Sequence, residues 1–413
     1  MSNFPAPKKL SIDAFRYDLP EDRIAIKPLD RRDQSKLLVY RQGQITDSHF
    51  DQADTYLESG DLLIFNQTKV IRARLLFQKS SGSTIEIMCL EPFDEPEISR
   101  AFLQKKECQW NALVGNAKRW KEPILRKNIK YNSGSFELCA EQRKNNNGNF
   151  VIRFFWDADL TFAEVIEAAG KIPLPPYLNR EADEDDVIRY QTVYAKDQGS
   201  VAAPTAGLHF TENSFAKLKA KAVTTAFITL HVGAGTFKPV KAPTMQEHEM
   251  HEERVSIPVD VIEKILHTVK EENRVISVGT TSLRTLESLY WFGVHVMKEK
   301  NVNVEEMRIS QWEPYEDEAD KNPSPVQALE TILSWMKKNN RIILSGFTQI
   351  LIAPGYEFKI ANVLITNFHQ PESTLLLLVS AFIGEDWRKV YQHALQNNYR
   401  FLSYGDSSLL FRK

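Results

Sequence analysis

The sequence contains only three cysteines, Cys89, Cys108 and Cys139, among 413 residues. They lie far apart and form no C-x-x-C pair, which argues against a disulfide framework and against a zinc site built from cysteines. Sparse and scattered cysteine is typical of proteins of the reducing cytoplasm. A cytoplasmic location is therefore expected.

Long apolar runs are also missing. The longest, TLLLLVSAFIG at 374–384, falls well short of the roughly 20 residues that span a bilayer, so no membrane association is expected. The first residues, MSNFPAPKKL, contain no apolar stretch after their charges, and no signal peptide is expected either. We expect the chain to be a soluble monomer.

Charge of one sign is not in excess. The chain has 52 Lys and Arg against 54 Asp and Glu, a net charge of −2, so its overall composition does not indicate a nucleic-acid-binding protein. The segment 104–130 is nevertheless basic and contains Trp110 and Trp120. Such a segment either neutralises phosphates and stacks on exposed bases, or forms a solvated strand edge guarded by lysines.

Hydrophobic patterns divide the chain into two regions. Between 71 and 156, short β-type runs follow one another and are separated by turns such as SSGS and NNNGN, which predicts a small barrel or sandwich. After residue 160, helical patterns alternate with apolar strands. The predicted fold is an α/β domain with a mixed, largely parallel sheet, made of 1–70 and 157–413 and interrupted by an inserted all-β small barrel at 71–156.

Small residues and polar clusters follow several predicted strands, where α/β proteins bind their ligands. In VAAPTAGLHF (201–210), Gly207 permits close approach to the backbone, and His209 is a candidate general acid or base. In LHVGAGTF (230–237), His231 precedes glycines that either expose backbone N–H groups to a ligand or form a tight turn.

Two further segments carry polar groups at the start of a predicted helix. In VGTTSLRTLES (278–288), the hydroxyl groups either cap the helix or leave its free N–H groups to hold an anion. In LITNFHQPEST (364–374), His369 faces a ligand or is a satisfied loop histidine. The segment HEMHEE (248–253) lacks the helical spacing of a zinc motif, so no metal site is predicted.

Taken together and in this order, these segments identify a protein family more specifically than any one of them does alone. Nearly end to end, the chain resembles the S-adenosylmethionine:tRNA ribosyltransferase-isomerase family of queuosine synthesis. The segments that carry the resemblance are DLLIFNQTKVIRARL, KIPLPPYLNR, YQTVYAKDQGSVAAPTAGLHFT, ITLHVGAGTFKPV, HEMHEERVSIP, RVISVGTTSLRTLES, LITNFHQPESTLLLLVSAF and YRFLSYGDSSLL.

The resemblance implies an enzyme that attaches a ribosyl unit from S-adenosylmethionine to 7-aminomethyl-7-deazaguanine at the wobble position of tRNA with a G-U-N anticodon. The products would be epoxyqueuosine in tRNA, adenine and methionine. S-adenosylmethionine would be a substrate, and no bound prosthetic group is expected. The family fold, an α/β domain with an inserted β-barrel, agrees with the change of pattern near 71–156.

The resemblance also implies roles for particular residues. Catalytic candidates are His209, His231 and His369, with Glu372 as a carboxylate partner, and which histidine does which task is left open. Candidates for substrate binding, including aromatic rings against adenine or the sulfonium and a helix start for the methionine carboxylate, are Tyr194, Thr205, Gly207, Phe210, Gly233, Gly235, Thr236, Phe237, Thr280, Thr281, Ser282 and Asn367. Candidates for tRNA binding are Lys69, Arg72, Arg74, Lys118 and Arg119.

The sequence departs from the family pattern in several places. Gln370 stands where Leu is usual and Arg72 where Pro is usual, and the chain is longer near 92–125 and 297–325. A paralogue with an altered acceptor therefore stays open. Two other functions are considered: a non-catalytic RNA-binding protein, and an S-adenosylmethionine-dependent methyltransferase, which the lack of a Gly-rich loop after a first strand disfavours.

Overall fold

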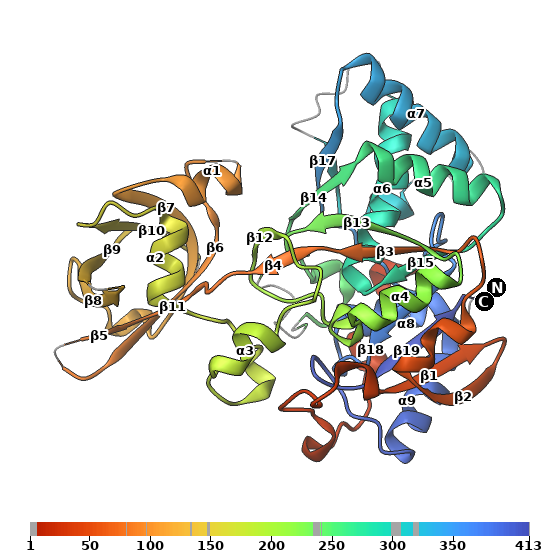
Figure 1. Ribbon diagram of the computed structural model, residues 1–413, viewed down its shortest axis with the longest axis horizontal. Coiled ribbons are helices and arrows are strands. Elements are labelled where there is room, and N and C mark those ends of the chain that lie inside the picture. Colours follow the sequence, from red (N-terminus) through yellow and green to blue (C-terminus); the bar gives the residue numbers. More distant parts are fainter. Residues whose placement is uncertain are drawn as a thin grey trace.

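The structure is a computed structural model that describes residues 6–412, except for 80, 96, 133, 147–148, 234–239, 241, 299–306 and 317–321. Its described strands form a ten-stranded sheet, a seven-stranded sheet and a two-stranded sheet. The two large sheets belong to two lobes that lie side by side (Figure 1). Each lobe has its own apolar core.

The larger lobe contains the ten-stranded sheet. At its centre β13, β3, β15 and β18 run parallel, whereas β14, β17, β19 and β2 add antiparallel pairings. The predicted mixed sheet is therefore confirmed, with its parallel part in the middle. In sheet order the strands are β16 (Arg308–Ile309), β17 (Ile343–Thr348), β14 (Glu253–Pro258), β13 (Thr224–Leu230), β3 (Leu62–Asn66), β15 (Val275–Val278), β18 (Val363–Asn367), β19 (Ser407–Phe411), β1 (Lys36–Arg41) and β2 (Gln44–His49).

Alternation along the strands gives this sheet two apolar faces. In β3, Leu62 and Ile64 join one core cluster, whereas Leu63 and Phe65 join the other. The second face is covered by the 3₁₀ segment at Phe50–Tyr56 and by α4 (Glu212–Ala220). The first face is covered by α5 (Val259–Lys270), α6 (Thr280–Lys298), α7 (Pro325–Lys338), α8 (Thr374–Ile383) and α9 (Trp387–Gln396).

The smaller lobe is a curled antiparallel sheet. It forms a half-barrel rather than a closed small barrel, because α2 (Phe162–Ala169) contacts both edge strands, β11 and β8, and fills the opening with Phe162, Val165 and Ile166 (Figure 1). In sheet order the strands are β11 (Gly170–Lys171), β5 (Arg74–Gln78), β6 (Thr84–Pro92), β7 (Glu107–Gly115), β10 (Asn149–Trp156), β9 (Gly134–Asn146) and β8 (Leu125–Tyr131).

The insert bounds of 71–156 stay a prediction. The core of the smaller lobe also contains residues of α2, and β11 belongs to its sheet, although both elements follow residue 156. The extra length near 92–125 forms α1 (Ile98–Leu103), β7 and a 3₁₀ turn at Ala117–Arg119. The extra length at 297–325 lies only partly within the described residues. Short α3 (Glu184–Arg189) and the parallel pair β4 (Thr68–Val70) and β12 (Asp197–Ser200) lie in the region between the sheets (Figure 1).

The connection between the lobes is tightly packed at one glycine. A Cβ atom on Gly170 would lie 1.9 Å from the carbonyl oxygen of Arg72, so the outgoing and returning chains cross in close contact there. The fold therefore consists of a covered α/β sheet with a second antiparallel sheet attached through residues near 70 and 171.

Among the described helices, none is both long enough and apolar enough to cross a lipid bilayer.

Helix α6 is held against α7 at Gly293. A Cβ atom at this position would lie 2.6 Å from the carbonyl oxygen of Ala328 and 2.8 Å from its Cβ. We predict that Gly293→Ala lowers the free energy of unfolding by about 1–3 kcal/mol, because overpacking outweighs the gain of about 1 kcal/mol in helix propensity. Urea unfolding measures the change, with Glu263→Ala on the exposed face of α5 as the control. A stabilised variant would show that the two helices separate easily.

Candidate active site

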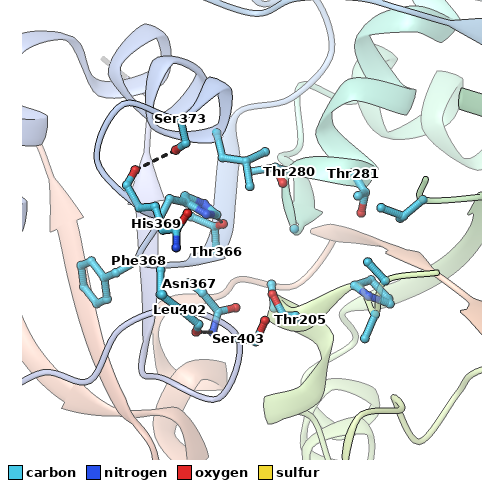
Figure 2. A pocket seen from close by; sticks show the side chains of 18 of the residues that line it. Thr205, Thr280, Thr281, Thr366, Asn367, Phe368, His369, Ser373, Leu402 and Ser403 are labelled. Carbon is cyan, nitrogen blue, oxygen red and sulfur yellow. Dashed lines mark hydrogen bonds between the residues drawn. The ribbon is translucent and has the colours of Figure 1, made fainter. Parts of the chain in front are cut away.

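A cavity opens where the central parallel strands β15 and β18 end (Figure 2). The structure brings together five of the residues expected at a binding site from the sequence. They come from the 3₁₀ turn Thr205–His209, the start of α6 and the segment that ends β18. These lining residues are Thr205, Thr280, Thr281, Asn367 and His369.

The start of α6 offers hydrogen-bond donors to this cavity. Gly279, with a φ of 89°, turns the chain directly from β15 into the helix. The first N–H groups of a helix have no partner within the helix. The hydroxyl oxygens of Thr281 and Ser282 are buried and have no hydrogen-bond partner, although Ser282 lies outside the lining. This helix start suits an anionic group of a ligand.

His209 lies behind Asn367 rather than in the cavity wall. Its Nε2 is 3.2 Å from the amide nitrogen of Asn367, which also donates to the carbonyl of Leu402 at 3.1 Å. Because that amide nitrogen donates, Nε2 accepts, and Nδ1 donates to Ser35 Oγ at 2.8 Å. Burial lowers the pKa of His209 to about 4. The imidazole is therefore neutral and orients Asn367, whose buried Oδ1 has no partner.

Of the three candidate histidines, His369 is the one that lines this cavity. Its backbone N–H donates to the hydroxyl of Tyr391 at 3.1 Å, and its carbonyl accepts from the hydroxyl of Tyr17. Its Nε2 lies 2.9 Å from Thr366 Oγ1. Burial lowers the pKa of His369 to about 3. The side chain is thus a neutral imidazole on a rigid backbone, in contact with the cavity.

His231 and Glu372 lie outside the lining. His231 packs against Gly199, where an added Cβ would lie 3.0 Å from the ring Nδ1, and this nitrogen is buried without a partner. Burial, with the charge of Arg254, lowers the pKa of His231 to about 4. The carboxylate of Glu372 pairs with the Arg16 guanidinium at 2.6 Å. Neither residue contacts the cavity in this structure.

Several expected binding residues belong to the core instead. A Cβ atom on Gly207 would lie 1.9 Å from the hydroxyl oxygen of Tyr194, so packing rather than ligand approach accounts for this glycine. Tyr194 and Phe210 both pack edge-on against Phe65, with ring centroids 5.0 and 4.8 Å away. Gly233 lies beside the cavity-lining Val232. The remaining expected residues of this loop, Gly235, Thr236 and Phe237, lie outside the described residues.

Other lining residues carry no local signal in the sequence. Tyr190 is fully buried, and the hydroxyl of Tyr177 lies 2.5 Å from Ser403 Oγ. Their segments are among those that carry the family resemblance, but nothing in their spacing marks them as a site. The described lining contains no Asp, Glu, Lys or Arg. A charged ligand would therefore meet dipoles and hydroxyl groups rather than opposite charges.

The candidate tRNA contacts fall into two groups. Lys69 and Arg72 line a separate cavity between the lobes, where Arg72 pairs with Glu167 at 3.0 Å. Arg74 is bound by both carboxylate oxygens of Glu86. Lys118 and Arg119 are exposed on the smaller lobe.

The idea that tryptophans of the basic segment stack on bases is wrong. Trp110 is fully buried and Trp120 is 8% exposed. Trp110 occupies the core-facing side of β7 and packs on Phe102 and Phe162, with ring centroids 5.3 and 5.2 Å away.

Among the described residues, no group of three His, Cys, Asp or Glu side chains is arranged to hold a metal ion.

The chain matches the sequence profile of the queuosine biosynthesis protein family over residues 12–410. The S-adenosylmethionine:tRNA ribosyltransferase-isomerase of Halothermothrix orenii is 37% identical over 405 residues, which cover 97% of this chain and 100% of the relative. The crystal structure of S-adenosylmethionine tRNA ribosyltransferase from Thermotoga maritima is 27% identical, covers 96% of this chain and 99% of that chain, and has a TM-score of 0.46.

The chain belongs to the queuosine biosynthesis protein family. The resemblance drawn from the sequence motifs is therefore confirmed. With it the enzyme class is confirmed, a transferase-isomerase of queuosine biosynthesis.

The neutral state of the buried histidines predicts how stability changes with pH. An unfolded histidine has a pKa near 6.5, so below that pH the unfolded state binds a proton that native His369 does not. Acidification from pH 7 to pH 5 therefore removes about 2 kcal/mol of stability through this residue. We predict that His369→Gln reduces the loss by that amount in urea unfolding, whereas His267→Gln, at an exposed site on α5, does not. An equal loss in both variants would contradict a neutral His369.

Proposed function

We propose that this protein transfers and isomerises the ribosyl moiety of S-adenosylmethionine onto 7-aminomethyl-7-deazaguanine at the wobble position of tRNA with a G-U-N anticodon. Epoxyqueuosine in tRNA, adenine and methionine are the products. Family membership and the activity named for the 37% identical relative support this assignment. The observation that carries it is the neutral His369 beside the unpartnered donors of α6 in one cavity.

The cavity suits the charges of the donor substrate. The methionine carboxylate would accept hydrogen bonds from the first N–H groups of α6 and from the Thr281 hydroxyl, where the helix dipole is positive. The unpartnered Oδ1 of Asn367 is available to accept from the exocyclic amine of adenine or from the methionine amine. Because the described lining has no ionised side chain, a sulfonium would enter without repulsion from a fixed positive charge.

His369 is our candidate for the base. The sulfonium acidifies the adjacent ribose methylene, and a neutral imidazole accepts the proton as adenine is expelled. The aminomethyl nitrogen of the tRNA base then attacks the unsaturated sugar, and methionine leaves as the epoxide closes. The hydrogen bond from His209 to Ser35 and the contact with the Asn367 amide give His209 an orienting role.

The tRNA would approach across the face where the two lobes meet. Lys69 and Arg72 line a cavity there, together with the half-buried Tyr131. Arg74 lies at the same connection. Lys118 and Arg119 on the smaller lobe would contact phosphates farther along the RNA. We assign these five positions to tRNA binding in this proposal.

The proposed reaction predicts that adenine is released from S-adenosylmethionine only when tRNA carrying the aminomethyl base is present. Chromatography of the small-molecule products, with mass spectrometry of the modified nucleoside, measures both halves of the reaction. Unmodified tRNA serves as the control. S-adenosylhomocysteine among the products would instead indicate a methyltransferase, and tight tRNA binding without adenine release would indicate a non-catalytic RNA-binding protein.

We further predict that His369→Gln lowers kcat by about 10²–10⁴-fold, the range for loss of a general base. The Michaelis constant for S-adenosylmethionine should change little, because the amide keeps a polar group of similar size in the cavity. Steady-state adenine release gives both constants. His267→Gln, at an exposed position on α5, should retain wild-type kinetics, and an unchanged kcat in His369→Gln would remove this residue from the mechanism.

A further inference from the structure

A second, smaller cavity adjoins the first on the far side of His209. It is lined by three arginines, Arg32, Arg189 and Arg400, together with Ser35, His209 and Ser403. Ser403 lines both cavities. The imidazole of His209 joins them as well, since its Nδ1 bonds Ser35 of the second cavity and its Nε2 contacts Asn367 of the first.

Positive charge in this second cavity exceeds negative charge. Arg32 donates to the carbonyl oxygens of Gln191 and Ile188, at 2.5 and 2.8 Å, and Arg189 donates to the carbonyl oxygen of Leu29. Within the part of the chain that the structure describes, neither guanidinium forms an ion pair with a carboxylate. Both therefore keep their full charge beside the cavity.

The third arginine is only partly compensated. Arg400 meets Asp406 Oδ1 at 3.4 Å, while the same carboxylate accepts backbone N–H groups from Lys36 and Arg400 at 3.0 and 2.7 Å. Asp406 is thus shared among several donors and does not line the cavity. Three arginines therefore line one small space with no acidic side chain in its described lining.

The charges of these arginines are not fully compensated by the described residues. The Nε of Arg189 is buried without a hydrogen-bond partner. Burial, with the charge of Arg189, lowers the pKa of Arg32, which shows that the two like charges oppose each other. A tetrahedral oxyanion would compensate these charges, because guanidinium groups bind phosphate oxygens through paired N–H donors.

We infer that this cavity binds a phosphodiester of the RNA substrate and holds its backbone while the acceptor nucleotide enters the neighbouring cavity of Asn367 and His369. The inference rests on the proposed function. The shared Ser403 and the single intervening imidazole of His209 make the two cavities immediate neighbours.

The test is the salt dependence of precursor tRNA binding. Arg189→Gln and Arg32→Gln are compared with wild type and with Arg341→Gln, a matched control at an exposed arginine after α7. Each cavity variant should reduce the slope of log Kd against log KCl concentration by about 0.7, the value for one single-stranded phosphate contact. The Kd at low salt should rise roughly tenfold, as for a lost charged hydrogen bond. The control should match wild type.

Two further measurements separate RNA binding from a structural role. S-adenosylmethionine affinity, measured by calorimetry without tRNA, should be unchanged in the cavity variants. Arg189→Lys keeps the charge and should restore most of the slope. If Arg189→Gln and Arg189→Lys both lower the melting temperature and neither changes the slope, the arginines only hold backbone carbonyls and the inference is wrong.

A competition experiment identifies the source of the oxyanion. Inorganic phosphate replaces chloride at constant ionic strength, and it should weaken tRNA binding to wild type more than to Arg189→Gln. If wild type binds phosphate but the tRNA salt slope is the same in all variants, the cavity takes a free oxyanion and not RNA. Absence of adenine release by the wild type with precursor tRNA would instead contradict the proposed function, independently of the slopes.

Discussion

The parallel pairing of β15 with β3 and β18 is the constraint on which the site depends. Val278 pairs with Phe65 on one side and with Ile365 on the other, so three chains reach the same edge of the sheet together. The chain after each strand then departs from that edge. As a consequence the start of α6 and the segment carrying Asn367 and His369 face one another without any long loop to position them.

Buried polar interactions keep this edge rigid. The carboxylate of Glu287 on α6 accepts the Tyr356 hydroxyl at 2.9 Å and backbone N–H groups of residues 359–361 at 2.8–3.1 Å. Arg284, one turn into the same helix, pairs with buried Glu253 of β14 and donates to the carbonyl of Ile350 at 3.2 Å. Breaking such a buried pair leaves an uncompensated charge, so α6 is tied to the sheet at two levels.

Burial keeps all three candidate histidines neutral, but they occupy different positions relative to the two cavities. Desolvation lowers the pKa of each of the three, yet only His369 contacts the larger cavity. His209 uses both ring nitrogens to connect Ser35 with Asn367, and thereby connects the larger cavity to the arginine-lined one. For His209, burial keeps the imidazole neutral, and this makes it a well-defined hydrogen-bond link.

Local patterns in the sequence predicted the secondary structure and part of the lining of the candidate cavity. Apolar runs alternating with helical patterns predicted the covered sheet, and small polar residues after strands located Thr280, Asn367 and His369, because ligands bind at the ends of parallel strands. Which face a side chain occupies was beyond these patterns. Trp110 is buried because its side of β7 faces α2, and that packing is a property of the folded lobe.

Only the tertiary structure decided how distant segments combine. Tyr177, Tyr190 and Ser403 line the cavity although nothing in their local spacing marks them as a site, and α2 closes a half-barrel that the strand pattern alone predicted as a barrel. Nothing in the sequence distinguishes three arginines, Arg32, Arg189 and Arg400, from the other arginines of the chain. They line one charged cavity only because three distant chain segments meet in the fold. The physical reason is that hydrophobic periodicity fixes local elements, whereas charge and cavity depend on neighbours far away along the chain.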